Sequence, residues 1–414
     1  MQLPKYSFGI GDRFGKQGEA QLAALQQLVR EGIGVVPVWN KSNREHVTIG
    51  SEPLETRLEA DAAVKNLNWP LHYFVDADHI NLETVDRYIE HCDFFTIDVA
   101  AYIGQKASNE HINKFLLENK NLAGPFKLPG IEAKYFITPE DIRNAAEKFL
   151  FAIHKAGEIY RRIHLKKGNN FVTEISMDEV EEAQTPTELF FILNAIAAEG
   201  IPAQTIAPKF TGRFNKGVDY HGDVNLFEKE FEEDLMVIDL AIKKFNLPEN
   251  LKLSVHSGSD KFTIYPVMGK LIKKHNKGIH VKTAGTTWLE EVIGLAMAGG
   301  EALKMVKEIY TEAIDRFDEL CNPYATVIDI DKAKLPSVQE IQKWNGETFA
   351  NSLRHIPGHP LYNPHFRQLM HVGYKLAAER GNIFTEMLTA NKEITGKQVT
   401  ENIYERHLKR LFNL

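Results

Sequence analysis

Short apolar runs recur along the chain, and each ends in polar residues before a helical pattern begins. The clearest is the stretch 72–79, where apolar positions give way to Asp76, Asp78 and His79. Runs of this length and composition are typical of buried strands. Eight such strands are predicted, at residues 6–10, 35–39, 72–79, 94–98, 171–177, 203–207, 251–255 and 279–282.

Helical patterns follow most of these runs. Helices are predicted over residues 18–31, 53–66, 82–91, 186–199 and 226–245. A longer helix is predicted from Pro139 to about His164, because Thr138 can cap it and proline suits the first helical position. Eight β/α units favour a TIM-type (β/α)8 barrel over an open doubly wound sheet.

Two segments depart from this alternation. Residues 104–135 are polar and are broken by Gly124-Pro125 and Pro129-Gly130, so we interpret them as an insertion or lid. Beyond Pro336 the chain is again mostly helical, for example over 368–379 and 400–412. We therefore expect a barrel domain over residues 1–335 and a helical C-terminal extension, 336–414, packed on it.

Composition and charge exclude several classes of protein. The 414 residues are 43% hydrophobic and carry a net charge of -7, which suits a large core and argues against a nucleic-acid partner. No stretch is apolar enough to span a membrane, and the first residues lack the blocks of a signal peptide, so we expect a cytoplasmic protein. The isolated Cys92 and Cys321 exclude a disulfide framework. Without a Gly-x-Gly-x-x-Gly or Walker motif we expect no nucleotide cofactor.

Histidines stand at the ends of the predicted strands, where barrel enzymes place their active groups. His79 and His256 are the clearest pair, and neutral imidazoles with a third ligand would suit a divalent metal. We favour His221, beside Gly222, as the third ligand, because His280 lies too early in its strand. Any one of these histidines alone would be read as structural, but the pair favours a metal site.

Carboxylates at the same strand ends provide candidates for proton transfer. Asp78 precedes His79, and Asp178 with Glu179 follows a strand farther along the chain. Such groups could act as base and acid on opposite faces of a substrate. Asp76 is a candidate for orienting a ligand histidine, whereas Glu174 in mid-strand needs a cationic partner.

Several cations and one polar turn could bind an anionic substrate. The cations are Lys209, Arg213, Lys216, Lys261 and Lys282. The turn formed by Ser257, Gly258, Ser259 and Asp260 could hold an anion through its backbone N–H groups. We interpret the remaining histidines as packing of the C-terminal tail, with the alternative that one of them reaches the rim of the barrel. They are His355, His359, His365 and His371.

The chain resembles the tagaturonate epimerase family in five strings that cover most of its length. They lie at 76–79, 173–179, 208–210 with 217–220, 253–261 and 280–286, and the most specific is His-Ser-Gly-Ser-Asp-Lys at 256–261. The resemblance implies a metal-dependent enzyme of hexuronate breakdown that interconverts tagaturonate and fructuronate. Related members are expected to act on tagatose and fructose.

The resemblance also implies roles for individual residues. It implies metal ligands at His79, His221 and His256, a proton acceptor at Asp78 and a proton donor at Glu179. Glu174 and Asp178 lie in the same string and remain alternatives for the donor. The metal is left open among zinc, nickel, manganese and cobalt, and the oligomeric state is left open too.

The reaction itself constrains the mechanism. The inverted carbon lies β to the ketone, so enolisation alone cannot invert it. We hypothesise retro-aldol cleavage and re-addition, helped by a metal and two carboxylates. A metal-dependent ketose isomerase or class II aldolase would use nearly the same residues, and a barrel that binds a sugar acid without turnover is the non-enzymatic alternative.

Overall fold

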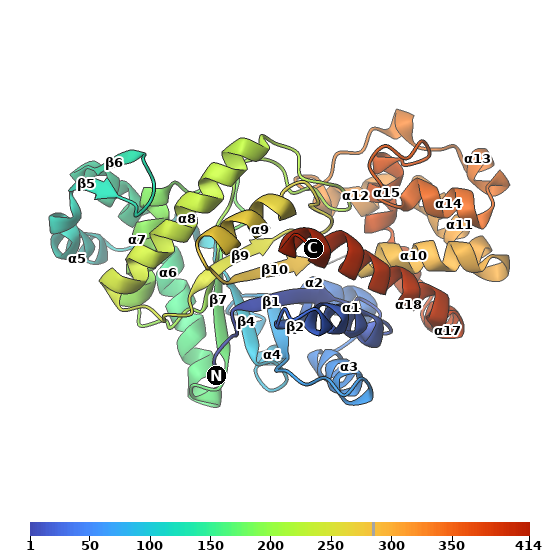
Figure 1. Ribbon diagram of the computed structural model, residues 1–414, viewed down its shortest axis with the longest axis horizontal. Coiled ribbons are helices and arrows are strands. Elements are labelled where there is room, and N and C mark those ends of the chain that lie inside the picture. Colours follow the sequence, from blue (N-terminus) through green and yellow to red (C-terminus); the bar gives the residue numbers. More distant parts are fainter. Residues whose placement is uncertain (284–285) are drawn as a thin grey trace.

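Eight parallel strands close into a barrel in the computed structural model, which describes residues 1–283 and 286–414 (Figure 1). Around the barrel the order is β1-β10-β9-β8-β7-β4-β3-β2, and β1 pairs with both β10 and β2. The strands are β1 (Tyr6–Gly11), β2 (Val35–Ser42), β3 (Phe74–Ile80), β4 (Phe94–Asp98), β7 (Val172–Ser176), β8 (Thr205–Ala207), β9 (Lys252–His256) and β10 (Ile279–Thr283). The predicted fold class and all eight predicted strands are confirmed. Ala284 and Gly285, part of one motif string, lie outside the described residues.

The barrel interior changes from apolar to polar along the strands. An apolar layer is formed by Leu3, Val36, Val38, Phe74, Phe94 and Val172. Because side chains alternate in a strand, residues two positions further on share the same face. That next layer contains Asp76, Thr96 and Glu174, all of them buried. The alternation therefore places a polar layer directly above an apolar floor.

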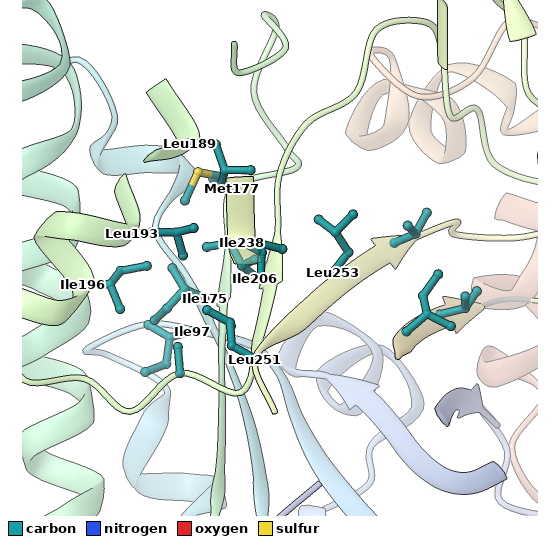
Figure 2. Packing of buried hydrophobic residues seen from close by; sticks show 14 of the residues in the cluster. Ile97, Ile175, Met177, Leu189, Leu193, Ile196, Ile206, Ile238, Leu251 and Leu253 are labelled. Atoms are coloured by element: carbon teal, nitrogen blue, oxygen red, sulfur yellow. The ribbon is translucent and has the colours of Figure 1, made fainter. Parts of the chain in front are cut away.

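Helices cover the outside of the barrel. Ile97, Ile175 and Leu253 on the strands belong to one apolar cluster with Leu193 and Ile238 on α7 and α8 (Figure 2). The surrounding helices are α1 (Gly18–Arg30), α3 (Pro53–Asn66), α6 (Pro139–Lys167), α7 (Pro186–Ala198), α8 (Val224–Phe245) and α9 (Tyr265–Lys274).

Two short helices differ from the predictions. α4 spans only Val85–Tyr88, whereas a helix over 82–91 was predicted. The Asn81 side chain accepts hydrogen bonds from the backbone N–H groups of Glu83 and Thr84, and this turn replaces the first turn of the helix. α2 (Asn43–Ile49) was not predicted, although Ser42 and Glu45 form a capping box at its start.

The insertion folds as a compact unit on the outer helices. It contains α5 (Asn109–Asn119) and an antiparallel hairpin, β5 (Gly124–Lys127) with β6 (Lys134–Ile137), at one end of the molecule (Figure 1). The ring of Phe126 lies 5.0 Å from that of Phe190 on α7. The Tyr135 hydroxyl donates to Glu233 of α8 at 2.5 Å.

A second hydrophobic core forms in the helical region that follows β10. Trp288, Ile309, Phe349 and Leu369 belong to it, so it begins earlier in the chain than the boundary at residue 336 drawn from the sequence. Its helices are α10 (Thr286–Ala298), α11 (Gly300–Asp315), α12 (Phe317–Cys321), α13 (Val338–Lys343), α14 (Gly346–Leu353), α15 (Pro364–Val372), α16 (Tyr374–Glu379) and α17 (Asn382–Ala390). No helix among the described residues is both long and apolar enough to cross a membrane.

The C-terminal segment returns to the barrel. α18 (Lys392–Glu401), the π-helix η5 (Asn402–Leu408) and α19 (Lys409–Phe412) pack between α1 and α9. Leu408 and Leu411 join the barrel core, and the ring of Phe412 lies 5.2 Å from that of Tyr6 on β1. This segment covers the outside of the barrel beside β1, while α10 leads away into the helical region (Figure 1).

A single buried carboxylate joins the barrel to the C-terminal helices. Asp260, in the loop after β9, accepts hydrogen bonds from Arg367 Nη2 at 2.7 Å, His355 Nδ1 at 3.1 Å and His407 Nε2 at 3.1 Å. Burial by itself raises the pKa of Asp260, but Arg367 and the two histidines hold that pKa well below its usual value. Four separate segments of the chain therefore meet at the Asp260 carboxylate.

We predict that Asp260→Asn lowers the free energy of unfolding by about 3 kcal/mol, because the buried Arg367 guanidinium loses its charged partner. Urea unfolding followed by circular dichroism measures the change. Asp318→Asn is the matched control, since Asp318 is exposed and pairs with Lys332 at the surface. Equal stability of the two variants would contradict the role of Asp260 in joining the barrel to the C-terminal helices.

Candidate active site

A cavity of ≈ 820 Å³ opens at the carboxyl ends of the barrel strands. This volume lies in the range of small-molecule sites. Its wall includes Asp78, His79, Asp178, Glu179, Lys209, Arg213, His256 and Lys282 from the barrel, and Tyr324, Val327 and His371 from the helical region. None of the described residues between 104 and 135 lines the cavity, so the insertion does not cover it in this structure.

A bulge at the end of β3 brings two neighbouring side chains into the cavity. The pairing of β3 with β4 shifts between Ala77 and Ile80, and His79 has a φ of 52°. In a regular strand Asp78 and His79 would point to opposite faces, but a left-handed residue in a bulge redirects its side chain. Both residues line the cavity, and His79 Nδ1 lies 2.6 Å from Asp78 Oδ1.

Two imidazoles and one carboxylate converge in the cavity. Asp178 Oδ1 lies 3.0 Å from His256 Nδ1 and 3.7 Å from His79 Nε2. The three ligand atoms lie within 4.8 Å of one another. Ligands of a tetrahedral divalent ion are roughly 3.4 Å apart, given bond lengths of about 2.1 Å. His256 Nδ1 is also buried, and its contact with Asp178 Oδ1 lacks the geometry of a hydrogen bond, so this set fits a metal ion.

Each of these histidines is oriented by a second carboxylate. Asp78 holds Nδ1 of His79, and Glu174 Oε1 lies 2.7 Å from Nε2 of His256. A ligand histidine whose other nitrogen meets a carboxylate is held in one tautomer and one orientation. Glu174 also has the cationic partner that its mid-strand position required, since Lys282 Nζ lies 3.5 Å away.

Lys282 is the centre of the polar layer. Its Nζ lies 2.8 Å from Asp76 Oδ2 and 2.8 Å from Asp78 Oδ1, and it donates to Thr96 Oγ1 at 2.7 Å. Burial opposes its charge, but the surrounding carboxylates raise the pKa of Lys282 above its usual value. Asp76 therefore contacts Lys282 and Thr96 rather than a ligand histidine, and Lys282 is engaged by protein carboxylates although it lines the cavity.

The carboxylates also change the protonation of the two imidazoles. Burial by itself lowers the pKa of His79, but Asp78 and Asp178 raise that pKa well above its usual value. Burial likewise opposes the charged form of His256, yet Asp178 and Glu174 raise its pKa to about 9. Without a bound cation, the carboxylates therefore favour the charged imidazolium form of both rings.

Three further predicted residues do reach the cavity. Glu179 is exposed in its wall. Lys209 is half-buried there, and burial lowers its pKa although Asp178 and Glu179 lie nearby. Arg213 also lines the cavity, with its Nη1 3.6 Å from Asp329 Oδ2 at the surface.

Three others lie elsewhere. His221 is exposed and forms a short antiparallel bridge with Arg213, so the structure brings Asp178 rather than His221 to the two imidazoles. Ser257 is buried, and its hydroxyl donates to the Lys282 carbonyl at 2.9 Å. Asp260 belongs to the junction with the C-terminal helices and does not line the cavity.

Sequence reasoning missed several residues of the site. Asp178 was considered only for proton transfer, although its position directly after a strand was visible. His371 is the one of the four C-terminal histidines that reaches the rim, the less favoured alternative for them, and it lines the cavity beside Arg13. Nothing in the local sequence around His371 indicates that its helix folds back over the mouth of the barrel. His280 lies below the site, with Nδ1 3.0 Å from Ser7 Oγ.

The fold and site define a (β/α)8-barrel enzyme with a histidine and carboxylate centre at the carboxyl ends of its strands. The profile of the tagaturonate epimerase family matches residues 1–411, and the chain belongs to this family of isomerases. The tagaturonate/fructuronate epimerase of Thermotoga maritima is 28% identical over 420 residues, which cover 97% of this chain and 80% of that protein.

Solved structures show the same fold. Two crystal structures of the fructuronate-tagaturonate epimerase of Cohnella laeviribosi, one native and one with glycerol, each superpose with a TM-score of 0.81. Their identities to this chain are 22% and 21%, and each alignment covers 99% of this chain and 82% of the other.

We predict that His256→Ala loses bound metal while the barrel stays folded, because one of three clustered ligand atoms is removed. Elemental analysis of purified protein and far-UV circular dichroism measure the two properties. His164→Ala, on the exposed surface of α6, should keep its metal content. Full metal retention by the His256 variant would contradict the site.

Metal affinity should depend on pH. His256 must lose its proton to bind an ion, and its pKa of about 9 in the metal-free protein means that binding releases this proton at neutral pH. Below that pKa, affinity should fall about tenfold per pH unit for each proton released. Titration calorimetry in buffers of different ionisation enthalpy counts the protons, and a count of zero at pH 7.5 would refute the prediction.

Proposed function

We propose that this protein interconverts D-tagaturonate and D-fructuronate, or the matching neutral ketoses tagatose and fructose. The observation that carries the proposal is the convergence of His79, His256 and Asp178 in the cavity of ≈ 820 Å³. Asp78 and Glu179 line the same cavity. Family membership and the activity named for the Thermotoga maritima relative support it.

We further propose that His79 Nε2, His256 Nδ1 and Asp178 hold a divalent cation. Zinc, nickel, manganese and cobalt all accept imidazole and carboxylate ligands. When bound, such an ion supplies positive charge that stabilises negative charge developing on substrate oxygens. A ligand role for His221 stays a prediction, which the metal content of His221→Ala tests.

Asp78 and Glu179 are the proposed proton acceptor and donor. Oδ1 of Asp78 is held by His79 and Lys282, whereas Oδ2 has no hydrogen-bond partner among the described residues and remains for a substrate hydroxyl. Of the three carboxylates in the string 173–179, Glu174 is buried behind His256. Asp178 belongs to the proposed metal ligands His79, His256 and Asp178, which we call the metal set. Glu179, exposed in the cavity wall, can exchange protons with solvent.

The proposed reaction needs no external oxidant or reductant. Asp78 takes the proton from the hydroxyl on the carbon β to the ketone. The bond between the α and β carbons then breaks, and the β carbon with its oxygen becomes an aldehyde. The bond's electron pair moves into the ketone fragment as an enediolate. After the aldehyde rotates, the α carbon attacks its other face, and Glu179 protonates the new alkoxide. The hydrogen on the inverted carbon never leaves it.

Lys209 is placed to help at the reacting carbons. It lines the cavity near Asp178 and Glu179, and its partly buried ammonium can stabilise an alkoxide there.

The experiment is an assay of metal-loaded protein with D-tagaturonate in D2O. We expect fructuronate as the product, with no deuterium on the inverted carbon. Glu179→Gln should keep its metal and lose about 10²- to 10⁴-fold in kcat, whereas the neighbouring Asp178→Asn should lose metal. Sugar chromatography, NMR and metal analysis provide the readouts. An aldose product, or net release of three-carbon fragments, would instead favour an isomerase or an aldolase.

A further inference from the structure

Arg13 forms part of the cavity wall opposite Asp178. In the closed barrel, β1 and β7 are separated by three strands in either direction. Arg13 follows the end of β1 and Asp178 follows the end of β7, and both line the cavity. A substrate that spans the mouth of the barrel from the metal set therefore has Arg13 at its far end.

The Arg13 guanidinium is held rigidly in this wall. Its Nε–H donates to Glu45 Oε1 at 2.9 Å, and its carbon lies 4.0 Å from the centroid of the Tyr374 ring. Nη2 lies 3.3 Å from His371 Nε2. With its side chain only 8% exposed, Arg13 loses little conformational freedom when it binds a ligand.

The neighbours of Arg13 leave its outer edge available to an anion. Burial and the nearby charges of Arg13 and Lys216 lower the pKa of His371 well below its usual value, which favours the neutral imidazole, whose Nε2 can accept from Arg13. Glu45 contacts Arg13 through Nε alone, because its Oε2 accepts from the backbone N–H and hydroxyl of Ser42. Nη1 donates to the backbone carbonyl of His371 at 3.5 Å and Nη2 lies 3.3 Å from His371 Nε2, so neither terminal nitrogen has a carboxylate partner among the described residues, and each keeps a second N–H group. Two such terminal nitrogens match the two oxygens of a carboxylate.

Three of the other cations of the cavity are less suited to that role. Lys282 is surrounded by Asp76, Asp78 and Glu174. Lys209 lies beside Asp178, where the carbons react. Arg44 is exposed in the cavity wall with its guanidinium 4.9 Å from the Tyr324 ring, and it adds positive charge beside Arg13.

We propose that Arg13 binds the substrate carboxylate and thereby selects hexuronates over neutral ketoses. This inference rests on the proposed function, in which the ketone and the reacting carbons lie at the metal set. In a hexuronate the carboxylate is at the opposite end of the chain from the ketone. Because Tyr374 and His371 belong to the helical region, that region contributes to substrate choice.

The test compares Arg13→Gln and Arg13→Lys with wild-type protein, each loaded with metal. Titration calorimetry with tagaturonate and with tagatose gives both dissociation constants, and the epimerase assay gives kcat and KM. Arg13→Gln should weaken tagaturonate binding about 10- to 150-fold, the value of a hydrogen-bonded charge pair, and change tagatose binding less than about threefold. Arg13→Lys, which keeps the charge without the two-pronged geometry, should fall between Arg13→Gln and wild type.

Lys16→Gln is the matched control, because Lys16 is exposed in the same loop and is not among the residues that line the cavity. Equal effects on both sugars, or an unchanged tagaturonate affinity in folded protein with full metal content, would overturn the proposal. A selective loss in Lys209→Gln but not in the Arg13 variants would also overturn it. If Arg13→Gln does not fold, Arg13→Lys decides. Wild-type protein without epimerase activity would refute the proposed function, whereas the binding selectivity still tests Arg13.

Discussion

The buried ion-pair network around Lys282 is the constraint on which the site depends. One ammonium on β10 lies within 3.5 Å of carboxylates from β3 and β7, and two of these, Asp78 and Glu174, in turn hold the two imidazoles. Buried carboxylates without a cation would be costly, so the closed barrel is compatible with this arrangement only while Lys282 is present. The network sets the direction of each imidazole before any ligand binds.

The helical region is connected to the loops of the barrel that form the cavity wall. Asp260 connects it to the loop after β9, directly beyond His256, and the next residue, Lys261, donates to the backbone carbonyls of Asn215 and Val218 in the loop after β8. Lys216, in that loop, lines the cavity. The six-residue string 256–261 therefore supplies one of the two clustered histidines, the link to the C-terminal helices and the support for a loop of the cavity wall. These structural contacts, as well as the chemistry of the cavity, explain the specific sequence of this string.

Local sequence predicted the strands and two of the three clustered residues well. Apolar runs buried on both faces are recognisable without tertiary information, and residues at their ends must meet at one mouth once the sheet closes. The direction of a side chain is harder to predict. Asp178 and Glu179 are neighbours with different surroundings, and Ser257 and Asp260 turn away from the cavity that His256 enters. Arg13 and His371 are 358 positions apart, and only the folded helical region reveals that they touch.

The most direct test of the account is a crystal structure of the metal-loaded protein with anomalous diffraction data at the metal absorption edge. The account predicts one strong anomalous peak within bonding distance of His79 Nε2, His256 Nδ1 and a carboxylate oxygen of Asp178. A peak bound elsewhere, with both imidazoles still directed only at Asp78, Glu174 and Asp178, would contradict it.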